Sequence, residues 1–161
     1  MNGRLSLIAS GMVIASLVIG IGAGCAGKSM SKGGSGDIVA DRQRVMKLQG
    51  ASWADIQAKA GNIEGVAVNA ETLALTAQQI PALFPEGSLT EKSKAKPEVW
   101  QKWAEFQAAA KNLETQAEKL RDASRAKNEQ LTQDLVKDFG RQACGTCHTP
   151  FRQPPPQQPR S

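Results

Sequence analysis

Apolar residues in the body of the chain recur with a helical period, and no stretch alternates with the period of a β-strand. The clearest run lies in residues 97–120. Its apolar positions follow one another at alternating steps of four and three, which places them on one helix face: Val99, Trp103, Phe106, Ala110, Leu113, Ala117 and Leu120. Pro97 and Glu98 suit the first turn of a helix, because that turn needs no amide donor and favours negative charge. We therefore predict one continuous helix from Pro97.

A second helix is predicted upstream by another seam with the same spacing: Val66, Ala70, Leu73, Ala77 and Ile80. Small alanines on this seam would allow a neighbouring helix or a flat ligand to approach closely. Pro81 ends the pattern because proline has no backbone N–H to continue the helix.

Two further helices complete the pattern. The first is predicted to begin at Asp37 as N-cap and to end near residues 61–62. Its expected core positions are Ile38, Val45, Met46, Trp53 and Ile56. The last is predicted to open near Asn128 and to place four apolar residues on its core face: Leu131, Leu135, Val136 and Phe139.

The connections between these segments are short except for residues 81–96. Short links between sequential helices favour antiparallel neighbours. We therefore predict an all-α fold, an antiparallel four-helix bundle that occupies residues 37–152.

Both ends of the chain differ in composition from the body. Residues 5–23 carry no charge, and the run ends in "GAGCAG" around Cys25. An uncharged stretch of this length is an export signal or a membrane anchor. Cys25 is the expected lipidation position, while an ordinary cleaved signal and a retained helix stay open as alternatives. Residues 1–24 are therefore assigned to the signal or anchor, 25–36 to a Gly/Ser-rich tether, and 153–161 to a proline-rich disordered tail.

Charge and composition exclude several functions. The chain has 20 basic and 15 acidic residues, interleaved along the helices. Nucleic-acid binding calls for a clustered basic stripe, so we expect no nucleic-acid partner. The sequence contains one histidine and no diagnostic carboxylate pair, so we also expect no enzyme activity. The predicted location is the periplasm or the outer face of the membrane, with attachment through the N-terminus.

The chemistry is concentrated near the C-terminus, in "CGTCH". Cys144, Cys147 and His148 have the C-x-x-C-H spacing of covalent haem attachment. On an α-helix these positions are i, i+3 and i+4, so the three side chains leave from one face. A structural zinc site would need four ligands, and the only other cysteine lies beyond the tether. We therefore predict one covalently attached haem c per chain, with His148 as iron ligand.

The whole domain resembles the class II cytochromes c, which include cytochrome c prime. Five stretches carry the resemblance, in chain order: "RQRVMKLQG" from Arg42, "LFP" from Leu83, "KPEVW" from Lys96, "CGTCH" from Cys144, and the following Phe151 and Arg152. The resemblance implies a haem protein with a four-helix bundle. It places Met46 on the distal side of the haem, Arg42 near a propionate and Arg152 on the proximal side.

Because His148 is the only histidine, the sixth iron position is open to Met46, to a weaker ligand or to none. Ligation by Met46 would favour an exported one-electron carrier with His/Met coordination, since a thioether raises the reduction potential. The alternative is a five-coordinate, high-spin protein that binds nitric oxide or carbon monoxide. A third hypothesis is a helical protein with a merely structural haem.

Partners follow from the same resemblance. We expect redox proteins, diatomic gases in the five-coordinate case, and a homodimer as one oligomeric state. The expected docking charges near the haem edge are cationic: Lys137, Arg141, Arg121, Arg125 and Lys127.

Pro150 departs from the family pattern because it follows His148 by only two residues. Proline removes an amide donor and disfavours helical geometry in the preceding residue. We therefore predict that the helix kinks or stops directly after His148 and that Arg152 swings outward.

Overall fold

The computed structural model describes residues 36–59 and 62–154. The signal or anchor, Cys25, nearly all of the tether and most of the tail lie outside the described residues. No helix among the described residues has the length and apolar character needed to cross a membrane.

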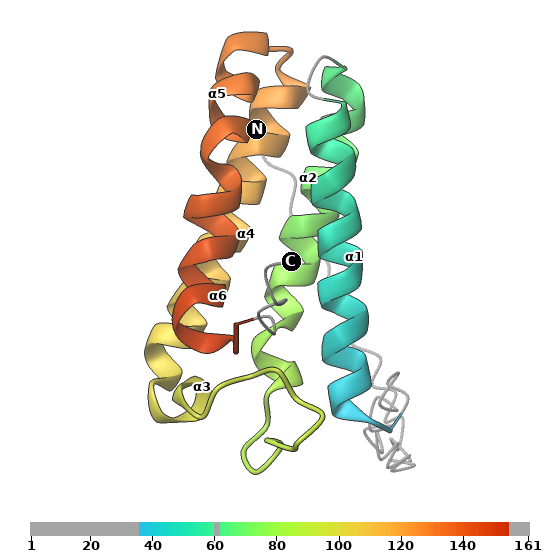
Figure 1. Ribbon diagram of the computed structural model, residues 1–161. Coiled ribbons are helices and arrows are strands. Elements are labelled where there is room, and N and C mark those ends of the chain that lie inside the picture. Colours follow the sequence, from blue (N-terminus) through green and yellow to red (C-terminus); the bar gives the residue numbers. More distant parts are fainter. Residues whose placement is uncertain (1–35, 60–61, 155–161) are drawn as a thin grey trace, which may run out of the picture. The chain divides into compact units, whose positions relative to one another are not determined.

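The domain is built from four long helical segments, and Figure 1 shows how they are arranged. They are α1 (Ile38–Ala58), α2 (Ile63–Gln79), α4 (Trp103–Arg125) and α5 (Glu129–Phe139). The last segment continues through the π-helical η2 (Gly140–Gly145) into α6 (Thr146–Phe151). The described residues contain no strand, only an isolated bridge between Ala95 and Arg152. The predicted four-helix bundle is confirmed.

The helix starts agree with the predicted capping residues. The Asp37 carboxylate accepts hydrogen bonds from the amides of Val39 and Ala40, at 2.9 and 3.1 Å. Asn128 caps α5 by accepting from the amide of Leu131 at 3.1 Å. Such side-chain caps satisfy amides that have no partner within the helix.

The core lies mainly between α2 and α4. All five predicted seam positions of α2 are buried, and α2 ends at Gln79, just before Pro81 and the short 3₁₀ helix η1 (Pro81–Leu83). The seam of α4 is buried as predicted except at Trp103, which is half-buried. Alanines on both seams allow the two helices to pack closely.

The predicted continuous helix from Pro97 is wrong in one respect. The structure has a short α3 (Glu98–Gln101) and then α4, with a break at Lys102. Lys102 has φ −120° and ψ 48°, outside the helical region. Apolar spacing did not reveal the break, because Val99 and Phe106 are buried on both sides of it.

The predicted core face of α1 is also partly wrong. Of the five expected positions only Ile56 is fully buried, and the others are half-buried. The residues that are buried on α1 are largely polar: Val39, Asp41, Arg42, Gln49, Ser52 and Ile56. Gln49 is accommodated by donating to the Thr76 hydroxyl of α2 at 3.1 Å. Polar contacts of this kind leave no trace in apolar periodicity.

Residues 84–96 form the long connection, and they lie beside the end of α6. The Lys96 amide donates to the Phe151 carbonyl at 2.9 Å, and the Gln153 amide donates to the Lys94 carbonyl at 2.8 Å. These two bonds join the connection to the C-terminal segment, which positions the site described next.

Candidate haem site

A cavity of about 380 Å³ lies between α1 and α6 and beneath the long connection. Met46 lines it from α1, and Cys147 and His148 line it from α6. Much of the remaining wall is aromatic and belongs to the core: Phe84, Phe106 and Phe151. The bundle therefore brings Cys147 and His148 of the motif together with the predicted distal methionine, which is about 100 residues away in sequence.

Both motif cysteines are free thiols and half-buried. Burial raises the pKa of Cys144, and burial together with the nearby Cys144 raises the pKa of Cys147 to about 11. Both groups are therefore protonated near neutral pH. Cys147 lines the cavity and Cys144 lies three residues earlier on the same helical segment, so the two thiols fit thioether bond formation with haem vinyl groups.

The helix that carries Cys144 is not the uniform α-helix expected from the motif spacing. Residues Gly140–Gly145 form a π-helix, and α-helical geometry resumes only at Thr146. Cys144 thus belongs to the wider π turn, while Cys147 and His148 lie on α6. The wider turn alters the angular relation between the two cysteines, and π turns are frequent at functional sites.

Asn112 on α4 holds this π segment. Its side-chain amide donates to the Gln142 carbonyl at 2.6 Å and to the Thr146 hydroxyl at 3.3 Å. The Thr146 hydroxyl in turn donates to the Ala143 carbonyl at 3.0 Å. Sequence reasoning missed Asn112, because a single polar residue on a helix surface carries no signal of a π turn.

His148 is suited to bind a metal. Desolvation by the surrounding protein lowers its pKa, and the positive charge of Arg152 lowers it further. The residue as a whole is exposed, so a planar group in the cavity could reach its imidazole. A lowered pKa favours the neutral imidazole, which is the form that ligates metals. The described residues contain no cluster of three or more His, Cys, Asp or Glu side chains that could hold a bare metal ion. The two thiols and the imidazole of the C-x-x-C-H motif are the groups that attach haem and ligate its iron.

Met46 reaches the same cavity from the opposite helix. It is half-buried and packs against the apolar core. Its placement on the distal side of a haem stays a prediction, although it lines the same cavity as His148. Whether its sulfur binds iron stays a prediction.

Arg42 has other partners than the predicted propionate. Its Nε donates to the Leu83 carbonyl at 2.6 Å, and Nη1 donates to the Ser88 carbonyl at 3.0 Å and to the Ser93 hydroxyl at 3.4 Å. Nη2 donates to the Ser88 hydroxyl. The guanidinium also lies over the Phe84 ring, 4.2 Å from its centroid. Burial lowers the pKa of Arg42, and only one of its five N–H groups stays available for a propionate.

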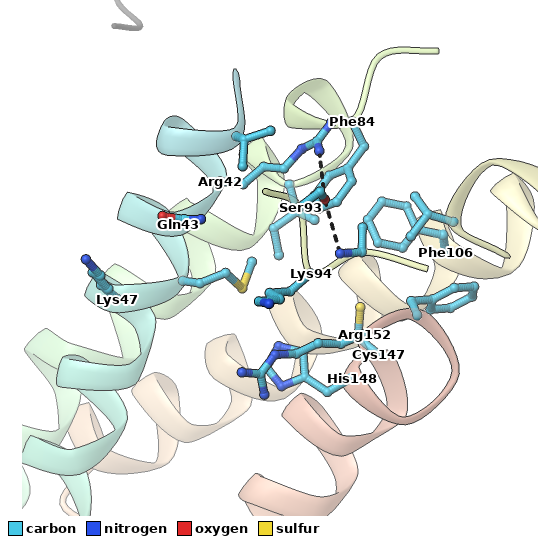
Figure 2. Close-up of a pocket in the computed structure, with 16 residues that line it drawn as sticks. Arg42, Gln43, Lys47, Phe84, Ser93, Lys94, Phe106, Cys147, His148 and Arg152 are labelled. Carbon is cyan, nitrogen blue, oxygen red and sulfur yellow. Dashed lines mark hydrogen bonds between the residues drawn. The ribbon is translucent and has the colours of Figure 1, made fainter. Parts of the chain in front are cut away.

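The predicted effect of Pro150 is wrong. α6 continues through Pro150 to Phe151, and the Arg152 amide still donates to the His148 carbonyl at 3.0 Å. Arg152 does not swing outward, because the bridge to Ala95 fixes its backbone and its side chain lines the cavity. Pro150 lies near the end of α6, where the lost amide donor breaks only one bond. Figure 2 draws Arg152 together with His148 among the cavity residues.

Most of the cations predicted to dock a redox partner form ion pairs with neighbouring carboxylates. Lys137 pairs with Asp134 at 2.8 Å, and Arg141 pairs with Asp138 at 2.6 Å. Arg121 and Arg125 both pair with Glu71. The first two are exposed pairs within a helix, and the pairs with Glu71 join α4 to α2, so none of these four cations is free beside the cavity.

Comparison with known proteins identifies one matching family and several similar proteins. The family model described as Cytochrome C' matches residues 37–152. A cytochrome c-554 from Cereibacter sphaeroides is 37% identical over 76 residues, which are 45% of this chain and 48% of that relative. The chain thus matches about half the length of this curated relative.

Two solved structures are similar in fold. Cytochrome c' from Thermochromatium tepidum is 25% identical with a TM-score of 0.67, covering 73% of this chain and 95% of the relative. A nitric oxide complex of a cytochrome c prime mutant from Alcaligenes xylosoxidans is 22% identical with a TM-score of 0.66, covering 74% and 95%. At 22% identity the second likeness concerns the fold alone.

Proposed function

This chain belongs to the cytochrome c' family, and on that premise we propose that it carries one haem c whose open sixth position binds a small gas such as nitric oxide or carbon monoxide. Cys144 and Cys147 would hold the group through thioethers, and His148 would ligate its iron. When bound, haem supplies an iron centre that accepts one electron and, on its free side, a diatomic ligand.

The apolar cavity wall is the observation that carries this proposal. Phe84, Phe106 and Phe151 line it, and Met46 packs against the core beside it. A neutral diatomic molecule enters an apolar pocket at little desolvation cost, whereas water loses hydrogen bonds there. The similarity to cytochromes c' supports this five-coordinate state more than His/Met ligation.

His148 contributes by remaining neutral. Partial desolvation and the charge of Arg152 both lower its pKa, so the imidazole keeps a lone pair for iron over the physiological range. The covalent bonds at Cys144 and Cys147 would make this ligation effectively intramolecular, which strengthens it by proximity.

A second function is favoured by one specific observation. Met46 lines the same cavity as His148 from the facing helix, so its thioether is within the site without any change of fold. With Met46 as sixth ligand the protein would be a low-spin, one-electron carrier whose partners are other redox proteins. Thioether ligation would also raise its reduction potential.

The optical spectrum of the purified haem protein distinguishes the two functions. The gas-binding proposal predicts high-spin ferric bands and stoichiometric carbon monoxide binding by the ferrous protein. Met46→Leu, a control of similar volume, should leave both unchanged. A low-spin spectrum with a thioether-to-iron charge-transfer band, lost in Met46→Leu, would overturn the gas-binding proposal in favour of the electron carrier.

A structural haem is the remaining hypothesis, and voltammetry tests it. Either proposed function requires a reversible one-electron couple. A haem that stays in one oxidation state across accessible potentials would leave only a structural role.

We also propose that the protein is exported and attached to the membrane through its N-terminal segment, with Cys25 as the lipidated residue. The mass of the mature chain tests this. A diacylglyceryl or triacylated mass that begins at residue 25 is expected. A mature chain without lipid, or one that retains residues 1–24, would refute lipidation.

A further inference from the structure

Haem carries two propionate carboxylates. Arg42 is expected to bind one of them, but most of its N–H groups already donate hydrogen bonds to other residues. Four of the five Arg42 N–H groups donate to the connection between α2 and α3, at Leu83, Ser88 and Ser93. Arg42 is only 4% exposed. Its main contribution in this structure is to hold that connection in place.

Three other cationic side chains line the cavity and donate no side-chain hydrogen bond to the described residues. Lys47, Lys94 and Arg152 contribute to its wall, and no Asp or Glu does. None of these three side chains pairs with a described carboxylate, in contrast to Lys137, Arg141, Arg121 and Arg125. A cavity wall with positive charge and no negative charge matches an anionic guest.

Lys94 is the best placed of the three. Its neighbours Ser93 and Ala95 are buried, at 3% and 8% exposure, while Lys94 itself is exposed at the cavity rim. Its carbonyl accepts from the Gln153 amide at 2.8 Å, which fixes the backbone against the segment that follows His148. The Lys94 side chain therefore begins at a backbone position that is held beside Gln153, and Gln153 follows the predicted iron ligand His148 by only a few residues.

In Figure 2 the side chains of Lys94 and Lys47 extend in different directions. The Lys47 side chain extends outward from α1, while the Lys94 side chain extends from the connection into the space between α1 and His148. Arg152 lies beside His148, where its charge already affects the imidazole. An ammonium group is a compact charge with three donors, which suits one carboxylate oxygen at a solvated rim.

We propose that Lys94 binds a haem propionate. This inference rests on the haem-binding part of the proposed function and applies to both axial-ligand states. Arg42 acts in it as a positioning residue, because its bonds to Ser88 and Ser93 hold the connection that carries Lys94.

The test compares holoprotein variants Lys94→Gln and Lys92→Gln by redox titration and by resonance Raman spectra of the propionate bending modes. Lys92 is an exposed lysine of the same connection that does not line this cavity. Loss of a cation near the iron stabilises the ferric state, so Lys94→Gln should shift the ferric-to-ferrous ratio at fixed potential by about three- to tenfold, as expected for a partly screened charge. Its propionate modes should shift as well.

Lys92→Gln should leave both readouts at the wild-type values. Lys94→Arg keeps the positive charge, so its ferric-to-ferrous ratio and propionate modes should lie close to the wild-type values. Identical potentials and propionate modes in Lys94→Gln and Lys92→Gln would overturn the assignment while leaving haem binding intact. A wild-type chain without covalent haem would instead overturn the proposed function, and this inference with it.

Discussion

The side-chain amide of Asn112 on α4 donates a 2.6 Å hydrogen bond to the main-chain carbonyl of Gln142 in the π-helical segment. This bond ties the middle of the bundle to the turn that carries Cys144. A π turn has poorer regular bonding than an α turn, so an outside donor helps to hold it.

We expect Asn112→Ala to lower the free energy of unfolding by about 0.5–1.5 kcal/mol, the usual range for one lost hydrogen bond. Urea denaturation of the holoprotein measures it. Gln116→Ala is the matched control, because Gln116 lies one turn further along α4 and makes no side-chain hydrogen bond with the described residues. Equal losses in both variants would contradict a specific role for Asn112.

Arg42→Gln should be strongly destabilising. The substitution removes the hydrogen bonds that the buried guanidinium donates, and it leaves the Leu83 and Ser88 carbonyls without their donor. Each bond to a charged donor is worth about 1.5–3 kcal/mol, so the total loss should reach about 3 kcal/mol or more. Denaturant unfolding and limited proteolysis of residues 84–96 report it.

Arg44→Gln serves as the control for Arg42 on the same helix. The Arg44 side chain is 63% exposed and pairs only with Asp41, three residues earlier. Substitution should change stability by less than about 0.5 kcal/mol. If both arginine variants unfold alike, the connection does not depend on Arg42.

Pro150→Ala should leave the helix content and the haem spectrum unchanged. α6 already runs to Phe151, and the bridge between Ala95 and Arg152 holds the following segment in either variant. The new amide at position 150 can add one bond to the Thr146 carbonyl, so stability should rise by at most about 1 kcal/mol. Far-ultraviolet circular dichroism and the optical spectrum provide the check. A longer helix or altered bands would show that proline limits α6.

Asp55→Asn should make stability less dependent on acid pH. Hydrogen bonds from Lys59 and Asn69 hold the pKa of Asp55 below its ordinary value. A carboxylate with a lowered folded-state pKa contributes stability above its unfolded value, near 3.8, and loses it as the pH falls through the folded value. The wild type should therefore have the higher urea midpoint at pH 7, and the difference from Asp55→Asn should shrink as the pH falls below 3.8 and through the lowered pKa of Asp55. A difference independent of pH would rule out this carboxylate as the cause.

Four features could be predicted from the amino-acid sequence alone: the helical segments, the capping residues Asp37 and Asn128, the buried seams of α2 and α4, and the C-x-x-C-H motif. These features depend on residues within one or two turns of each other. Backbone capping, apolar spacing at three and four residues, and the chemistry of two thiols and an imidazole are all local in the chain. Family resemblance then predicted Met46 as the distal residue, and in the structure Met46 lines the same cavity as His148.

Four other features depend on how the helices pack in three dimensions: the break at Lys102, the π turn at Cys144, the polar buried face of α1 and the course of the chain after Pro150. Arg42 bonds to residues 41 to 51 positions away, and Asn112 bonds to a carbonyl 30 positions away. Lys94 and Arg152 come to the same cavity because a backbone bridge joins their segments. Such contacts depend on how helices pack against one another. A hydrogen bond between distant segments leaves no periodic signal in sequence, so the cations that face the cavity could be identified only from the fold.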